Sequence, residues 1–190
     1  MGIPIWSTDI KQFGDIDHIA DILDFDPSQV QLPFTPAMGW WSPVCTSYSI
    51  AACSHHRNHD LSPKTSEAEQ GDAMVKKVLN LIGYYQRLNP NFIWFIENPR
   101  GLLRKMPFMQ GLPRHTVTYC QYGDTRMKPT DIWTNCNWWV PRPICKNGSP
   151  CHESAPRGSR TGTQGRKGSY ERSKIPEQLC VEIVQNFIFI

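Results

Sequence analysis

The sequence predicts an α/β fold in which two apolar strands and one long helix form a parallel unit. The first strand is residues 38–41 and the second is residues 92–96. Between them, residues 66–85 carry apolar side chains at the three- and four-residue spacing of an amphipathic helix. A strand–helix–strand unit joins parallel strands through a right-handed crossover. Residues that follow the two strands should therefore lie at the same edge of one sheet.

The composition is typical of one globular domain. The chain has 190 residues, of which 39% are hydrophobic, and its seven Trp can build a substantial core. No apolar run is long enough to span a bilayer, so we expect no membrane segment. The first six residues lack the basic and apolar regions of a signal peptide. The seven Cys are an odd number and are scattered, which favours reduced thiols and a cytoplasmic location.

The N-terminal third predicts short strands followed by a polar loop. Residues 3–6 indicate a short strand, and residues 19–23 a second apolar element with an acid at its edge. Residues 47–64 are polar and predict a mobile loop, longer than most connections in compact domains. Its three histidines fit a solvated loop better than a metal site, since no second ligand pair lies near them in the sequence: His55, His56 and His59.

The remaining elements follow the long helix. Ser66 and Glu69 have the spacing of a capping box, and Asn89-Pro90-Asn91 ends the helix. Residues 116–120 and 131–134 predict two later strands, which we expect to be antiparallel. A final helix begins at Ile175-Pro176-Glu177, with Pro in its first turn.

Residues 142–174 form a basic segment with no apolar period. They hold eight basic and two acidic residues, a net charge of +6, so the rest of the chain is net −3. Such asymmetry favours a polyanion partner, although a solvated basic tail would have the same composition. We divide the chain into a core of residues 1–135, a basic Gly- and Arg-rich segment of residues 136–174, and a C-terminal helix of residues 175–190 that packs back on the core.

A thiol and a carboxyl group follow the two parallel strands. The first strand leads into Ser42-Pro43-Val44-Cys45, and the second ends on Glu97-Asn98-Pro99. A thiolate can attack a ring carbon while a carboxyl group hydrogen-bonds the ring atom that gains charge. Each residue alone also fits an inert role, since most cysteines are unreactive and an acid before Asn-Pro can cap a turn. Together they predict covalent catalysis.

In this order, these motifs resemble those of the DNA cytosine-5 methyltransferases, particularly the short, divergent phage-type members. Residues 42–49 are similar to the nucleophile motif of the family, and residues 95–99 to its Glu-Asn-Val motif. The resemblance implies a Rossmann-like sheet, S-adenosylmethionine as cofactor and DNA as substrate. It also implies that Cys45 attacks C6 of a flipped cytosine while Glu97 protonates or hydrogen-bonds N3.

The resemblance further implies a cofactor site in the N-terminal part. Asp9 would hold the ribose hydroxyls of S-adenosylmethionine, and Ile10 would pack on the adenine. Asp21 would bind the adenine amino group, and Pro43 would line the same site.

Further residues are implied in catalysis and DNA contact. Arg126 would correspond to an arginine of the family's Gln-x-Arg-x-Arg motif and act in catalysis. The polar loop after Cys45 would close over the flipped base. Contacts to DNA would come from the loop, the second strand end and the basic segment: Ser47, Arg100, Arg157, Arg160 and Arg166.

The chain also departs from the family pattern. The first strand and the Phe-x-Gly-x-Gly cofactor loop of the family have no counterpart before Ile3, and Val44 replaces the second Pro of the nucleophile motif. These departures leave room for a second chain that supplies the loop, or for an inactive remnant that only binds DNA. A phage-encoded chain would act in the host cytoplasm. An amino-methyltransferase fits less well, because that chemistry does not use a thiol.

A candidate zinc site lies in the basic segment. Cys136, Cys145, Cys151 and His152 could bind zinc and stabilise a region that cannot build a core. The spacing lacks a Cys-x-x-Cys pair, so free thiols in a basic loop are the alternative. A zinc-containing DNA-binding module without chemistry is a further reading of the chain.

Overall fold

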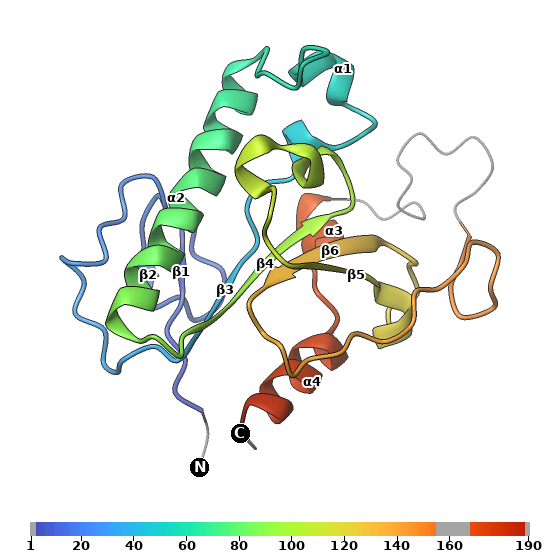
Figure 1. The fold of residues 1–190 in the computed structure, drawn as a ribbon. Helices are drawn as coiled ribbons and strands as arrows, with labels where there is room; N and C mark the ends of the chain where they lie inside the picture. Colours follow the sequence, from blue (N-terminus) through green and yellow to red (C-terminus); the bar gives the residue numbers. More distant parts are fainter. Residues whose placement is uncertain (1–2, 155–167, 189–190) are drawn as a thin grey trace.

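The computed structural model describes residues 3–154 and 168–188 as an α/β fold with a mixed sheet (Figure 1). Four strands form the main sheet, and two short parallel strands form a second one. The small sheet pairs β1 (Thr8–Asp9) with β2 (His18–Ile19). The main sheet has the order β3 (Met38–Trp41), β4 (Ile93–Pro99), β6 (Pro129–Thr134) and β5 (Arg114–Thr118).

The central parallel unit is confirmed. β3 pairs with β4 in parallel, and α2 (Ser66–Leu88) connects them. β4 and β6 are antiparallel, as are β6 and β5, which confirms the antiparallel prediction for the later strands. The first of these strands is Arg114–Thr118 rather than residues 116–120, because the chain turns at Tyr119 into the short helix η4 (Tyr119–Tyr122).

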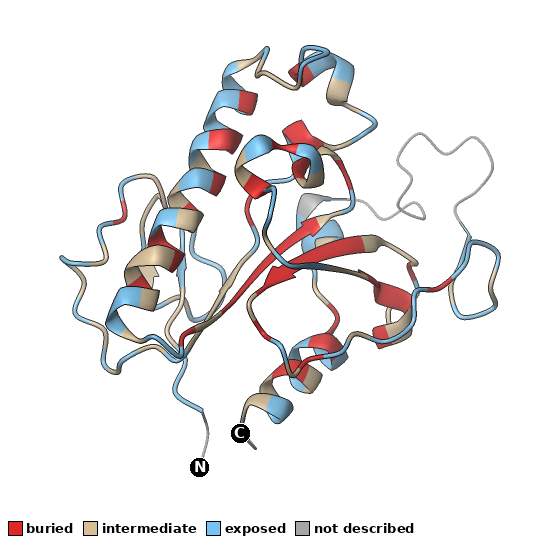
Figure 2. Ribbon diagram, viewed as in Figure 1, coloured by how far each residue is buried: buried red, intermediate tan, exposed pale blue. Residues whose placement is uncertain are grey.

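The main sheet is covered on both faces, and β4 is buried along most of its length (Figure 2). Alternate side chains of a strand point to opposite faces. Trp94 and Ile96 belong to one core cluster together with the apolar side of α2. Phe95 belongs to a second cluster that includes Leu179 and Ile183 of α4 (Glu177–Ile188). A strand buried on both faces explains the continuous apolar run of residues 92–96.

The start of α2 differs from the prediction by one residue. Thr65 is the N-cap, and its hydroxyl accepts a hydrogen bond from Ala68 N at 3.3 Å. The predicted capping box at Ser66 and Glu69 is therefore wrong, because Ser66 is already the first helical residue. Asn89 ends the helix, as predicted.

The polar stretch after Cys45 is more structured than the sequence indicated. It contains η1 (Thr46–Tyr48) and α1 (Cys53–His56), and Arg57 within it is buried. His56 is also buried and shares a hydrogen bond of 2.9 Å with Thr65 Oγ1. The prediction of a mobile loop over residues 47–64 is therefore wrong for residues 47–57.

Other predicted elements need correction. Residues 3–6 form no strand, and the apolar element predicted at residues 19–23 consists of the end of β2 and a turn. Within the basic segment, α3 (Ser169–Ser173) interrupts the predicted irregular structure. Two short 3-10 helices, η2 (Leu102–Lys105) and η3 (Pro107–Met109), follow β4. No helix among the described residues has the length and apolar character needed to cross a membrane.

Candidate active site

Cys45 and Glu97 follow neighbouring parallel strands of the main sheet. Trp41, the last residue of β3, pairs with Ile96 of β4. Glu97 is therefore the first residue of β4 that extends beyond the end of β3. Cys45 lies four residues beyond Trp41, at the N-cap of η1. The negative charge of Glu97 is close enough to raise the pKa of the Cys45 thiol. Two surface hollows, one along α4 and one beside Trp139, are lined by neither residue.

A hydrogen bond ties the Cys45 loop to the end of β4. The side-chain amide of Asn98 donates to the carbonyl oxygen of Pro43 at 2.9 Å, and both residues are buried. Because Asn98 directly follows Glu97, this bond fixes the loop that carries the thiol relative to the carboxyl group. Pro43, predicted near the cofactor, thus lies at the junction of the two strand ends.

Glu97 is buried in an environment that favours its protonated form. Its side chain is buried, and Oε1 accepts a hydrogen bond from the Tyr119 hydroxyl at 2.7 Å. Burial raises the pKa of Glu97 above its ordinary value, whereas Lys128, Tyr119 and Ser42 act in the opposite direction. A carboxyl group that holds its proton near neutral pH can donate a hydrogen bond to a basic ring nitrogen.

The thiol of Cys45 is not activated in the free chain. Cys45 is an exposed residue, but the protein around its sulfur raises the thiol pKa by desolvation, and the charge of Glu97 raises it further. Lys128 opposes both effects. Thiolate formation would therefore be favoured when Glu97 carries a proton and Lys128 keeps its charge.

Lys128 is a site residue that the sequence analysis missed. Burial lowers the pKa of Lys128, while the charges of Glu97 and Cys45 raise it. Its ammonium group lies 4.6 Å from the centroid of the Tyr119 ring and donates to Arg172 O at 3.0 Å. No motif in the sequence marks this lysine, because its proximity to Glu97 depends on β6 pairing with β4.

A buried ion pair anchors the segment after Cys45. The guanidinium of Arg57 donates to both carboxylate oxygens of Asp72 at 2.8 Å, and the Tyr48 hydroxyl donates to the same carboxylate at 2.8 Å. Arg57 also donates to Ser47 Oγ at 3.1 Å. Ser47, predicted to contact DNA, is thus buried within this network, and its DNA contact stays a prediction.

The predicted arginines occupy different environments. Arg126 is buried, forms an ion pair with Asp124 and donates to the carbonyl oxygens of Arg172 and Lys174. The side chain therefore connects the turn before β6 to the end of α3 and to Lys174 directly after it. Arg100 is exposed directly after β4. Three further predicted DNA contacts lie outside the described residues: Arg157, Arg160 and Arg166.

The predicted cofactor acids lie at the small parallel sheet. Asp9 ends β1, and its backbone carbonyl accepts from Ala20 N at 3.0 Å, which brings the carboxyl ends of β1 and β2 together. One carboxylate oxygen of Asp9 caps Lys11 N, and one of Asp21 caps Leu23 N. Within the described part of the chain, the other oxygen of each acid accepts no hydrogen bond, so it could accept one from a hydroxyl or amino group. Ile10 is exposed beside them.

The cysteine group differs from the predicted set. Cys145, Cys151 and His152 lie together, but the fourth member of the group is Cys120. Cys136 lies after the end of β6, where it is buried and its backbone N–H donates to Thr134 Oγ1. The sequence analysis included Cys136 because it lies in the segment of residues 136–174 with the other three, whereas the fold of η4 brings Cys120 into place.

The fold and the site define an α/β protein whose thiol and carboxyl group lie at adjacent strand ends, an arrangement suited to covalent catalysis. The chain is similar to a protein of Frog virus 3 (isolate Goorha) named "Probable DNA (cytosine-5)-methyltransferase". The two are 25% identical over 194 aligned positions, which cover 94% of this chain and 88% of the relative. This distant relationship confirms the resemblance to the DNA cytosine-5 methyltransferase family. No family model and no solved structure matches the chain.

Proposed function

We propose that the chain is a DNA cytosine-5 methyltransferase that works through a covalent adduct of Cys45. The observation that carries the proposal is the placement of Cys45 and Glu97 at the ends of the paired strands β3 and β4, joined by the Asn98–Pro43 hydrogen bond. The viral relative is named for this activity, which supports DNA cytosine as the substrate.

The chemistry assigns a distinct role to each group. The thiolate of Cys45 forms a bond to C6 of a cytosine, and Glu97 gives its proton to N3 as charge develops there. The ring then becomes nucleophilic at C5 and takes the methyl group. Loss of the C5 proton to a base, release of Cys45 from C6 and return of the N3 proton to Glu97 restore the aromatic ring and both side chains. Lys128 stabilises the thiolate before attack, because its positive charge lowers the pKa of the Cys45 thiol.

S-adenosylmethionine supplies an electrophilic methyl group in this reaction. Asp9 and Asp21 suit the cofactor, since each has a carboxylate oxygen that accepts no hydrogen bond among the described residues. Carboxylates are good acceptors for ribose hydroxyls and for an adenine amino group. The exposed Ile10 beside them offers an apolar surface for the adenine ring.

DNA is the proposed partner. The target carbon of cytosine is inaccessible in a duplex, so the base must be turned out of the helix, at a cost of a few kcal/mol. The basic segment would supply phosphate contacts, and its binding should weaken with salt. A second chain that supplies a glycine-rich cofactor loop remains part of the proposal.

The test is methyl transfer to DNA followed by nucleoside analysis. The purified chain is incubated with DNA and S-adenosylmethionine carrying a labelled methyl group, and the product nucleosides are separated by mass spectrometry. The proposal predicts 5-methylcytosine, and its loss in Cys45→Ser and Glu97→Gln. N4-methylcytosine or N6-methyladenine would contradict it. DNA binding without any methylation would favour an inactive remnant.

A further inference from the structure

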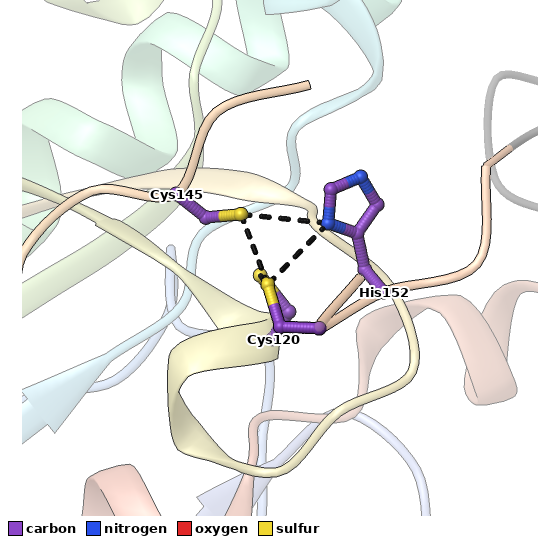
Figure 3. A group of neighbouring side chains, drawn as sticks. Cys120, Cys145 and His152 are labelled. Atoms are coloured by element: carbon purple, nitrogen blue, oxygen red, sulfur yellow. Dashed lines mark hydrogen bonds between the residues drawn. The ribbon is translucent and has the colours of Figure 1, made fainter. Parts of the chain in front are cut away.

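Three cysteines and one histidine gather on the side of the main sheet that lies next to η4. Cys120 belongs to η4, and the other three come from the stretch that follows β6: Cys145, Cys151 and His152. Figure 3 shows the Cys145 thiol and the His152 ring turned toward each other, with Cys120 close to both. The Sγ atoms and a ring nitrogen of His152 all lie within 4.8 Å of one another.

Three of the distances within this group lie near the edges of a tetrahedral zinc site. Zinc binds thiolate sulfur at about 2.3 Å and imidazole nitrogen at about 2.0–2.1 Å, so tetrahedral ligand atoms are roughly 3.5–3.8 Å apart. Cys151 Sγ lies 3.8 Å from Cys120 Sγ and 3.7 Å from His152 Nδ1. Cys145 Sγ lies 3.4 Å from His152 Nδ1 and 3.1 Å from Cys151 Sγ. Of these four pairs, only the last would have to separate appreciably to accept a metal, and the two remaining pairs, both with Cys120, lie within 4.8 Å.

The adjacent Cys151 and His152 can serve as ligands together. Adjacent residues rarely point at one centre, but the Nδ1 atom is the ring nitrogen nearer to the backbone, and it is the one that faces the thiols. Among the described residues the other ring nitrogen has no hydrogen-bond partner, so Nδ1 makes the polar contacts of this ring. The side-chain amide of Gln121 lies 3.5 Å from Cys151 Sγ, where it can donate to a metal-bound thiolate.

A cross-link would stabilise the surrounding chain. Residues 142–154 contain no helix or strand, although Arg142 at their start bonds to Tyr122, Gln121 and Glu182. Cys145 N donates to Thr118 Oγ1 at 2.9 Å, and Glu153 N donates to Thr125 O at 2.9 Å. A segment with so little apolar burial gains stability from a structural metal.

We propose that Cys120, Cys145, Cys151 and His152 bind one Zn²⁺ in a closed, structural Cys₃His site. On binding, the three thiols release their protons to solvent and the three thiolates, with neutral His152, complete the coordination. The metal joins residues 145–152 to η4. Because η4 begins with Tyr119, which donates to Glu97, the same metal holds this hydroxyl at the candidate active site.

Metal analysis of the purified full chain tests the site. After expression with added zinc and removal of loosely bound metal, we expect about one zinc per chain. Cys120→Ser and His152→Ala should each lose most of this zinc. Cys136→Ser is the matched control, because Cys136 is also buried near β6 but lies outside the group, and it should keep its zinc.

Cobalt substitution and disulfide mapping keep the test decisive if a variant fails to fold. The parent chain, stripped of zinc and titrated with Co²⁺, should show the visible bands of tetrahedral cobalt and thiolate-to-cobalt charge transfer. A parent chain that takes up neither zinc nor cobalt would overturn the proposal. A Cys145–Cys151 disulfide in protein purified without reductant, with no bound metal, would overturn it as well. Neither outcome depends on whether the chain methylates DNA.

Discussion

At the scale of single residues, the site is governed by three ionisable groups that influence one another. Burial raises the pKa of Glu97, and burial together with the negative charge of ionised Glu97 raises the pKa of the Cys45 thiol. Lys128 works against both effects. Protonation of Glu97 would therefore remove one of the two effects that raise the pKa of the Cys45 thiol.

Glu97→Gln should separate stability from activity. Glu97 has a pKa above its ordinary value of 4.5 in the folded chain, so the folded state holds a proton at pH values where the unfolded chain has lost it. Stability therefore falls as the pH rises from about the ordinary value through the raised one. Glutamine cannot ionise, so it removes the loss of stability that the parent suffers as the pH rises. The variant should therefore be more stable than the parent at neutral pH. Methyl transfer should fall by roughly 10²–10⁴-fold, because the general acid is lost.

Thermal unfolding across pH measures this difference. The melting temperature of Glu97→Gln should exceed that of the parent at pH 7–8 by about 2–4 °C for each kcal/mol gained. The gap should close below the ordinary glutamate pKa, where both states of the parent are protonated. A variant less stable than the parent at neutral pH would show that Glu97 is held as a carboxylate.

Lys128→Met should make the Cys45 thiol less reactive. Loss of this cation removes the main favourable charge near the sulfur, so the thiol pKa should rise. The measurement is the pH profile of Cys45 alkylation, followed on its own peptide by mass spectrometry. Glu97→Gln is the opposite control and should shift the profile to lower pH. Unchanged profiles in both variants would contradict the electrostatic account.

At the scale of elements, the key feature is that the segment after Cys45 is anchored. Arg57 and Asp72 connect this segment to α2, and Tyr48 and Ser47 join the same network. The anchor fixes η1, which begins directly after Cys45. Gly101 packs against the backbone of η1. A Cβ at this position would come within 2.4 Å of Tyr48 O.

Removing one partner of the Arg57–Asp72 pair should be costly. Arg57→Ala leaves a buried, unpaired carboxylate and should lower the free energy of unfolding by about 3–5 kcal/mol. Asp72→Ala should cost a similar amount, whereas the double variant should cost less than the sum of both. Denaturant unfolding of the parent, the two single variants and the double variant gives the coupling free energy between Arg57 and Asp72. Strict additivity would show that the pair does not act as a unit.

Gly101→Ala should disturb the two strand ends together. The added methyl group would clash with the backbone of Tyr48, so either η1 or the chain after Glu97 must shift, at a cost of roughly 1–3 kcal/mol. Gly83→Ala in α2 is the matched control, because its Cβ would meet only the Arg87 side chain at 3.6 Å. In Gly101→Ala the free energy of unfolding should fall and the rate of Cys45 alkylation should change. In the control, the free energy of unfolding should not fall and the alkylation rate should stay the same.

The sequence predicted the elements with strong local signals. The period of α2 and the buried run of β4 define β3–α2–β4, which in turn places Cys45 near Glu97. Lys128 and Cys120 could not be found in this way, because each reaches its site through the pairing of β6 or the turn at η4. The burial of Arg57 could not be predicted either. A polar stretch indicates an exposed loop unless the ion-pair partner of its arginine, here Asp72 on α2, is known.

At the scale of the whole molecule, the main sheet separates two cores. α2 covers one face together with the cluster around Trp94 and Ile96, and α4 covers the other with the cluster around Phe95 (Figure 1). Arg142 of the basic segment bonds to Glu182 of α4 and to the backbone of Gln121 in η4. The candidate active site and the proposed zinc site share η4, which carries both Tyr119 and Cys120, so loss of the metal should be felt at Glu97.

The most direct test of the central claim is covalent trapping on DNA. The parent chain and Cys45→Ala are incubated with S-adenosylmethionine and a duplex library that contains 5-fluorocytosine, which blocks release of the adduct. The account predicts a complex that survives denaturation, with the DNA attached to the Cys45 peptide, and no such complex with Cys45→Ala. A folded chain that binds the library but forms no adduct, or forms one equally well in Cys45→Ala, would contradict it.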